Sequence, residues 1–235
     1  MKRKWIALGI ALTAMLGETA LASETLSETL QQKQIVSAVE SWKPGKNKGN
    51  YTVTDLDQNG RLEIISADYS KEDQVTVSHI WEIDEEGKLQ KLETSWSEEE
   101  SQPDLITKST KVWYDEEEDV YYYLFTDQEK LEDGSERERK MTISLKDGQL
   151  STVLLAEKTT DEAGTETFAD ADGNEITAAD YENAAETMYG ELKEKEAKFK
   201  WINTKEHAIG SDVPMEQLLE LVSEANAGFS VRDPE

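Results

Sequence analysis

The stretch RERKMTISLKDGQLSTVLLAE, residues 137–157, decides the fold of this chain. Its two halves, residues 137–145 and 150–157, are rich in the β-branched and aliphatic residues that are typical of strands. Asp147-Gly148 separates them, and these two residue types supply the positive φ angles that a tight hairpin turn requires. The stretch therefore predicts an antiparallel hairpin.

The same pattern extends from this hairpin back to Tyr51. Short runs rich in β-forming residues alternate with acidic turns at residues 84–87, 115–119 and 133–134. The further predicted strands are residues 51–54, 62–68, 75–83, 89–96, 110–114 and 120–125. Residues 50–158 are therefore expected to form a meandering antiparallel sheet.

Helical patterns lie on both sides of this sheet. Residues 23–42 contain no Pro or Gly and place apolar side chains at helical spacing, so they predict an N-terminal helix that residues 43–49 connect to the sheet. After the sheet, Thr177 and Asp180 form a capping-box pattern ahead of a helix expected to run to Glu196. A strand is expected next, where the apolar residues Ala197, Phe199 and Trp201 alternate with lysines.

The final helix is expected behind Ser211 or Asp212, with Pro214 in its first turn. The fold class is therefore α+β: a meandering antiparallel sheet flanked by an N-terminal helix and two C-terminal helices. Residues 23–235 are predicted to form a single domain, with two closely packed lobes as the alternative. A chain of this length buries roughly 70% of its unfolded surface, which is enough for a core that needs no disulfides.

The N-terminus has the three parts of a secretory signal peptide. A basic patch at residues 1–4 precedes an apolar run at residues 5–16 and the small-residue pattern Ala20-Leu21-Ala22. The apolar run is shorter than the roughly 20 residues that a membrane-spanning helix needs. Residues 1–22 are thus expected to be removed, which leaves a mature chain that begins near Ser23 and is secreted or displayed at the cell surface.

The charge and cysteine content exclude several classes of function. The chain has 25 basic and 51 acidic residues, and loss of the signal peptide removes three basic residues and Glu18, leaving 22 and 50, a net charge of −28. Such a surface repels nucleic acid and anionic membranes. The chain contains no cysteine, which excludes disulfides, a lipid-modified anchor, thiol catalysis, zinc-thiolate sites and iron-sulfur clusters.

The sharpest local signal is the nonapeptide DLDQNGRLE, residues 55–63. Calcium prefers six to eight oxygen ligands, and a tight loop offers them from alternate residues while glycine turns the backbone. The candidate metal ligands are the side chains of Asp55, Asp57, Asn59 and Glu63 and the main-chain carbonyl of Arg61. An EF-hand is excluded, because its twelfth position is Ser66 and the flanking segments are predicted to be strands.

These residues resemble the D-x-D-x-D/N-G-x-x-D/E loops of FG-GAP or integrin α-chain type, which lie in β-hairpins. The resemblance implies a bound calcium ion. The wider order of signal peptide, helix, hairpin, acidic meander and two helices is similar to that of a group of exported proteins from gut-type Firmicutes. No sister repeat of the loop occurs, which speaks against a propeller. The alternative is a polar turn whose carboxylates are solvated.

Other patterns in the chain are weaker. Residues 170–175 also alternate acidic positions, but their glycine comes early and an ordinary Asp-Gly turn is expected. His207 has no partner motif, and His79 and Glu82, three residues apart on a predicted strand, face opposite sides and cannot share a metal. No nucleophile elbow, P-loop or dinucleotide fingerprint occurs.

The sequence thus favours an exported, non-catalytic domain that binds one calcium ion and acts on an extracellular protein or glycan. One alternative is a carbohydrate-binding module, because exposed aromatic faces beside carboxylates suit hydroxyl-rich ligands. A second is a hydrolase that needs only two carboxylates about 5 to 10 Å apart. The aromatic residues available for stacking are Trp42, Trp81, Trp96, Trp113, Trp201, Tyr121, Tyr122 and Tyr123.

Overall fold

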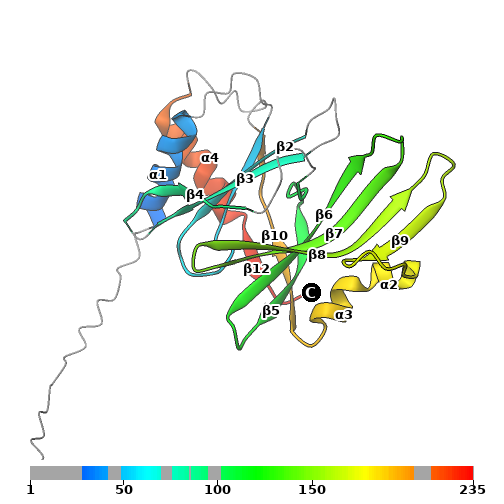
Figure 1. Cartoon of the computed structure of the whole chain (residues 1–235). Coiled ribbons are helices and arrows are strands. Elements are labelled where there is room, and N and C mark those ends of the chain that lie inside the picture. Colours follow the sequence, from blue (N-terminus) through cyan, green and yellow to red (C-terminus); the bar gives the residue numbers. More distant parts are fainter. Residues whose placement is uncertain are drawn as a thin grey trace, which may run out of the picture.

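The computed structural model of the protein describes residues 28–41, 49–69, 76–84, 86–94, 102–203 and 213–234. Within these residues the chain forms two antiparallel sheets and four helices, which confirms the predicted α+β class (Figure 1). None of the helices in the described ranges is long and apolar enough to cross a membrane. The predicted signal peptide, residues 1–22, lies outside the described residues.

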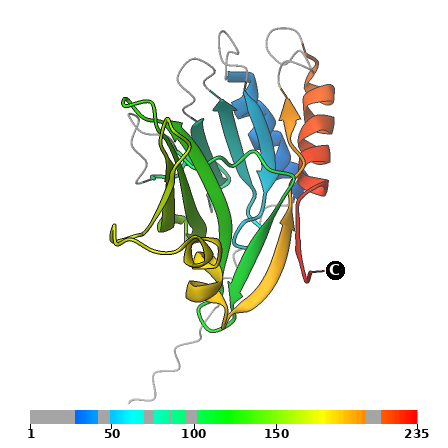
Figure 2. The ribbon, with the colours of Figure 1, turned by 90° about the vertical axis from the view of Figure 1, so that its right-hand side faces the viewer.

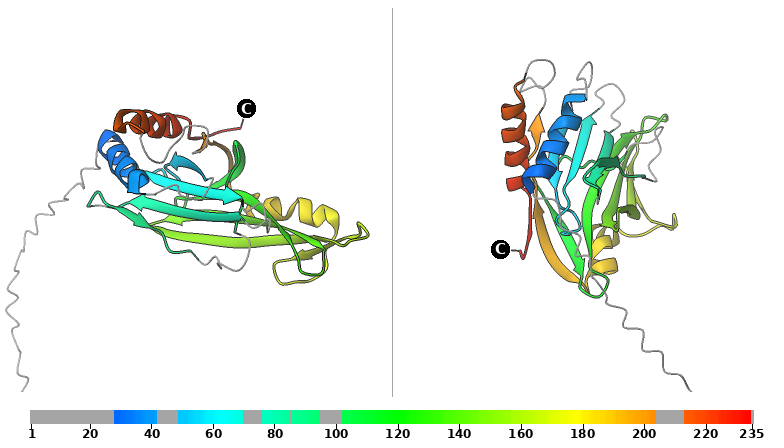
Figure 3. Two further views of the ribbon diagram at one scale, coloured as in Figure 1. Left: turned by 90° about the horizontal axis from the view of Figure 1, so that it is seen from above. Right: turned by 90° about the vertical axis from the view of Figure 1, so that its left-hand side faces the viewer.

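The first sheet, called the small sheet, is covered on one face by two helices. Helices α1 (Glu28–Ser41) and α4 (Met215–Ala227) lie side by side on it (Figure 3). Apolar residues of both helices and of the sheet face form one core between them, including Ile35, Val53 and Val222. In order across the small sheet, its strands are β11 (Ile202–Asn203), β1 (Asn50–Thr54), β2 (Glu63–Tyr69), β3 (Thr76–Ile83) and β4 (Leu89–Lys91).

The second sheet, called the large sheet, packs one face on the small sheet and the other on two short helices. Ile65 and Ile80 of the small sheet share the inter-sheet core with Tyr123 and Ile143 of the large sheet. Figure 2 shows α2 (Ala178–Glu182) and α3 (Ala184–Tyr189) near one end of the molecule, where they cover the outer face of β7 and β8. In order across the large sheet, its strands are β12 (Ser230–Arg232), β10 (Lys193–Lys198), β5 (Ser109–Asp115), β6 (Val120–Lys130), β7 (Glu136–Lys146), β8 (Gln149–Thr160) and β9 (Glu166–Asp170).

The hairpin predicted from residues 137–157 is confirmed. β7 pairs with β8 from Glu136↔Thr160 to Lys146↔Gln149, and only Asp147 and Gly148 connect them. Their φ angles are 51° and 73°, the left-handed values that a two-residue turn of this kind requires. The meander is wrong as one sheet, because strands β1–β4 and β5–β9 lie in two different layers.

The last third of the chain departs most from expectation. Thr177 is the predicted N-cap and forms the reciprocal capping box with Asp180. The helix expected to run to Glu196 is wrong, since α3 ends at Tyr189 and strand β10 begins at Lys193. β10 pairs with β5 on one side and β12 on the other, and this pairing outweighs the local helical spacing.

Smaller corrections concern the ends of elements. Pro214 is the N-cap of α4 rather than a residue of its first turn, and Ser211 and Asp212 lie outside the described residues. The predicted strand at residues 89–96 is shorter, because β4 ends at Lys91. The strand expected at residues 197–201 is displaced: β10 ends at Lys198, and β11 then begins in the small sheet.

Candidate metal centre

The predicted calcium loop connects β1 to β2 in the small sheet. We call residues 55–62 the β1–β2 loop. The two strands pair up to Thr54↔Glu63, so the loop leaves and re-enters the sheet at directly opposed positions. Its turn needs left-handed backbone at Gln58, with φ 57°, and at Gly60, with φ 83°. The predicted β-hairpin setting is therefore confirmed.

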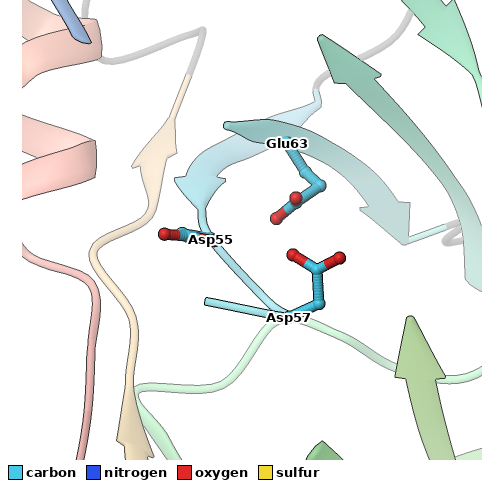
Figure 4. Close-up of side chains that lie close together, drawn as sticks. All are labelled: Asp55, Asp57 and Glu63. Carbon is cyan, nitrogen blue, oxygen red and sulfur yellow. The ribbon is translucent and has the colours of Figure 1, made fainter. Parts of the chain in front are cut away.

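Three of the five predicted ligand residues meet at one point. One carboxylate oxygen from each of Asp55, Asp57 and Glu63 lies within 4.8 Å of the other two. In Figure 4 the carboxyl groups of Asp57 and Glu63 face each other. Calcium binds oxygens at about 2.3 to 2.6 Å, so two ligands on opposite sides of one ion are about 5 Å apart. These three residues, called the carboxylate cluster, are close enough to share one ion.

Glu63 is the member of the cluster that is removed from solvent. Alternation along β2 places it on the same face as Ile65, which points into the inter-sheet core, and its exposed fraction is 0%. One carboxylate oxygen, Oε2, accepts hydrogen bonds from the Thr54 hydroxyl at 3.0 Å and from the Leu56 N–H at 2.7 Å. The other oxygen, Oε1, is buried and has no hydrogen-bond partner among the described residues. A buried carboxylate oxygen is expensive to leave unpaired, so this atom points to a missing partner.

Asp55 and Asp57 are held by the loop itself. The Gly60 N–H donates to both carboxylate oxygens of Asp55, at 3.3 and 3.1 Å. The Asn59 N–H donates to Asp57 Oδ1 at 3.3 Å. Both carboxylates are half-buried, and each oxygen has a second lone pair for another partner. The turn therefore holds two carboxylates near Glu63 without saturating them.

The cluster has an electrostatic cost that a cation would remove. Burial, followed by the charges of Asp57 and Asp55, raises the pKa of Glu63 well above its ordinary value. Burial also raises the pKa of Asp57 to about 6, and the charges of Glu82 and Asp55 add to the effect. Burial raises the pKa of Asp55 as well, although the hydrogen bond from the Gly60 N–H lowers it in part. A proton or a bound cation is needed to relieve the repulsion.

Glu82 increases this negative charge, and sequence reasoning missed it. Glu82 on β3 is the direct cross-strand partner of Glu63 and is also buried. Like charges in this position destabilise a sheet. Glu82 forms an ion pair with Arg61, whose Nη2 and Nε lie 3.0 and 3.1 Å from Glu82 Oε1. Arg61, a residue of the loop itself, therefore pairs with Glu82, and its charge only partly offsets the rise in the pKa values of Asp55 and Asp57.

Asn59 does not present its oxygen to the cluster. Its amide Nδ2 donates to Asp57 Oδ2 at 2.7 Å, and its Oδ1 accepts from the Arg61 N–H at 2.6 Å. Asn59 thus positions Asp57 in this arrangement, whereas its side chain was predicted to be a ligand. The carbonyl of Arg61 belongs to the peptide unit that donates the Leu62 N–H to Gln31.

Two further residues that the sequence did not reveal hold the loop in place. Gln31 of α1 bonds to the backbone at Gly60 and Leu62, and the Tyr123 hydroxyl of β6 donates to the Leu56 carbonyl at 2.6 Å. These contacts join residues 29 to 67 positions apart in the chain. The only signal in the sequence is that Tyr123 lies on the strand face shared with Phe125.

The second acidic loop is closed on itself. Asp170 Oδ1 accepts from the Asp172 N–H at 3.0 Å and from the Asn174 N–H at 2.8 Å. Hydrogen bonds from the side chain and backbone of Asn174 lower the pKa of Asp170, which is partly exposed. This is the ordinary turn that the sequence predicted. His79 is half-buried on β3 with its ring edge-on to Trp81, and His207 lies outside the described residues.

The tyrosines of β6 divide between the two faces of the large sheet, as strand alternation predicts. Tyr123 and Phe125 enter the inter-sheet core, against which Tyr121 is partly buried, and Tyr122 packs on the opposite side. There Tyr122 stacks on Tyr189 with ring centroids 4.7 Å apart. Both tyrosines line a groove of about 510 Å³ at the end of α3, together with Asp115, Thr187, Met188 and the acidic residues Glu186 and Glu191. Trp42 and Trp96 lie outside the described residues.

Comparisons with known proteins found no match to this chain. The chain matches no protein-family model, no curated protein and no solved structure.

Proposed function

We propose that this protein is an exported, non-catalytic domain that binds one calcium ion between β1 and β2 and acts on an extracellular protein or glycan. The observation that carries the metal site is Glu63 Oε1, a buried carboxylate oxygen without a hydrogen-bond partner in the described residues, next to two further carboxylates. The N-terminal sequence pattern supports the export of the protein.

Calcium fits this cluster better than other common metals. All of its donors are carboxylate oxygens, which hard cations prefer, whereas zinc and copper favour nitrogen and sulfur. A loop supplying most ligands tolerates the irregular geometry of calcium, and magnesium demands a stricter octahedron and gives up its waters reluctantly. Asp55, Asp57 and Glu63 would hold the ion, and the ion would neutralise the charge that burial makes costly.

The direct test is a calcium titration followed by thermal unfolding at constant ionic strength. Extracellular calcium modules bind with dissociation constants of about 0.1 to 1 mM, and calcium at ten times that constant stabilises the folded state by about 1.4 kcal/mol. For a domain of this size the melting temperature should rise by about 3 to 6 °C. Magnesium at the same concentration should give a smaller rise.

The variants Asp55→Ala and Asp57→Ala should each lose this calcium response. The matched control is Asp170→Ala, which alters the other acidic loop and should keep the full response. Constant ionic strength is essential, because salt also screens the repulsion within an acidic surface. If Asp55→Ala responds to calcium like the parent, the loop is only a solvated turn.

Glycan binding at the groove beside α3 is a second candidate, favoured by the stacked pair Tyr122 and Tyr189 with carboxylates around it. Aromatic faces bind the apolar faces of sugars, and carboxylates accept hydrogen bonds from hydroxyl groups. A glycan array with the parent and the Tyr122→Leu variant tests this role. Binding that the variant retains would place the ligand elsewhere.

A further inference from the structure

Helix α1 reaches the β1–β2 loop through one buried side chain. Gln31 has an exposed fraction of 2%, and both ends of its amide bind loop backbone. Its Nε2 donates to the Gly60 carbonyl at 2.8 Å, and its Oε1 accepts from the Leu62 N–H at 2.7 Å. Gln31 therefore forms hydrogen bonds with the two peptide groups on either side of Arg61.

These two hydrogen bonds determine which way the Arg61 peptide groups point. In a trans peptide the carbonyl and the N–H project to opposite sides. Because the Leu62 N–H points at Gln31, the carbonyl of Arg61 points away from α1. Because the Gly60 carbonyl points at Gln31, the Arg61 N–H points away as well, and it meets Asn59 Oδ1 at 2.6 Å. Gln31 thus orients the predicted carbonyl ligand and, through Asn59, the carboxylate of Asp57.

We propose that Gln31 is a positioning residue of the cation site, and that cation binding and the docking of α1 on the small sheet are therefore thermodynamically linked. The inference rests on the proposed calcium site. Partners that orient metal ligands are worth roughly 10- to 100-fold in affinity. Because linkage is reciprocal, a helix that improves cation affinity is itself held more firmly when the cation is bound.

The neighbouring residue provides a matched control. Gln32 is also a buried glutamine of α1, with an exposed fraction of 6%, and its Oε1 accepts from the Ser223 hydroxyl of α4 at 2.8 Å. Replacing Gln32 disturbs the contact between α1 and α4, whereas replacing Gln31 disturbs the contact between α1 and the loop. Methionine keeps the length of both side chains and removes their hydrogen bonds.

The first experiment measures calcium affinity by calorimetry, at constant ionic strength, for the parent, Gln31→Met and Gln32→Met. We expect Gln31→Met to weaken calcium binding about tenfold or more and Gln32→Met to change it less than about threefold. The second experiment follows amide hydrogen exchange. Calcium should slow exchange in α1 of the parent and of Gln32→Met, and this protection should be lost in Gln31→Met.

The results separate the two proposals. A parent protein that binds no calcium contradicts the proposed function itself. A parent that binds calcium while Gln31→Met and Gln32→Met have equal affinities contradicts only the role of Gln31. If Gln31→Met does not fold, Gln31→Glu decides, since it keeps an acceptor for the Leu62 N–H and is compared with Gln32→Glu, which has the same charge. Equal affinity in that pair overturns the inference.

Discussion

The two acidic loops of this protein have similar sequences and opposite surroundings. Both the β1–β2 loop and the turn at residues 170–174 alternate acidic residues, and the glycines at their turns, Gly60 and Gly173, have φ angles of 83° and 80°. In the turn, the carboxylate of Asp170 accepts from the N–H groups of Asp172 and Asn174 and stays partly exposed. At the end of the β1–β2 loop, strand β2 carries Glu63 into the inter-sheet core, where it lies close to the carboxylates of Asp55 and Asp57.

Among the described residues, the turn at residues 170–174 is one of three similar turns. Asp84, Asp161 and Asp170 each accept a hydrogen bond from the N–H four residues later, at 2.7 to 2.8 Å. In each of these turns, the N–H of the aspartate donates in return to the carbonyl of the residue four positions later. Backbone hydrogen bonds lower the pKa at all three sites, with the Asn174 side chain foremost at Asp170. Acidic spacing alone therefore predicts a turn, and the burial of a strand residue beside it distinguishes a candidate metal site.

The largest effect is expected at Glu63. Glu63→Gln keeps acceptors for Thr54 and Leu56 but removes the buried charge, and calcium affinity should fall about 100-fold or more, because outer partners alone are worth roughly 10- to 100-fold. Glu175→Gln, after the second turn, should leave affinity unchanged. Calorimetry of the two variants measures the difference. Equal affinities would mean that the buried carboxylate is not part of the ion site. The two acidic loops would then differ in burial but not in metal binding.

When a chelator removes calcium, Asp57 and Asp170 should also differ in how their contributions to folding stability change with pH. Asp57 has a folded-state pKa raised from 3.8 to about 6, so its contribution becomes unfavourable as the pH rises through this window. Asp170 has a lowered pKa, so its charge stabilises the folded state above the ordinary value of 3.8, and this stabilisation is lost as the pH falls through the folded-state pKa. At pH 7.5 the two aspartates should act in opposite directions.

In chelator at pH 7.5, Asp57→Asn should therefore raise the melting temperature by about 2 to 4 °C, which corresponds to roughly 1 kcal/mol in a domain of this size. Asp170→Asn should lower it by a smaller amount. The difference for Asp57→Asn should shrink toward pH 4, whereas the difference for Asp170→Asn should persist at pH 4 and shrink only at lower pH. With calcium present the sign should reverse for Asp57→Asn alone, because the variant then lacks a ligand. Thermal melts of both variants across pH, with calcium and with chelator, measure these differences. If calcium does not reverse the sign of the effect of Asp57→Asn, the proposed site is contradicted.

The smallest effect is a comparison of Gly60→Ala with Gly173→Ala. An added Cβ meets no atom within 4 Å at either position, so each variant suffers only the strain of a left-handed alanine, about 1 kcal/mol. Their melting temperatures in chelator should fall by similar amounts, about 2 to 4 °C. Only Gly60→Ala should also weaken calcium binding, since the Gly60 N–H holds Asp55. Calorimetry of both variants checks this, and equal calcium affinities would show that the loop backbone does not shape the site.

Much of the local structure could be predicted from the sequence. Period-two alternation correctly separated Tyr122 from Tyr123, and the Asp-Gly pair correctly gave the turn between β7 and β8. The spacing of residues 55–63 brought three carboxylates to one point, because strand pairing at Thr54 and Glu63 closes the loop. These features depend on neighbours in the chain, which is why a pattern reveals them.

The remaining features depend on distant pairings. Glu82 joins the site only because β3 pairs with β2 in a register that sets it opposite Glu63. Gln31 joins it only because α1 packs over the small sheet. The helix predicted to run to Glu196 stops early because β5 and β12 recruit Lys193–Lys198 as a strand between them. No local periodicity contains information about these partners.

The segment that runs from β10 to β11 sets the order in which this molecule can fold. Lys193–Lys198 joins the large sheet between β5 and the edge strand β12, and Ile202–Asn203 forms one edge of the small sheet, where Asn203 pairs with Asn50 across 153 positions of sequence. The hairpins between neighbouring strands close short loops and can form early, whereas the pairing of β10 with β5 and of β11 with β1 waits for this late segment. We therefore expect folding to be slow and limited by capture of the C-terminal third, so that a chain interrupted before Lys193 retains hairpins but neither finished layer.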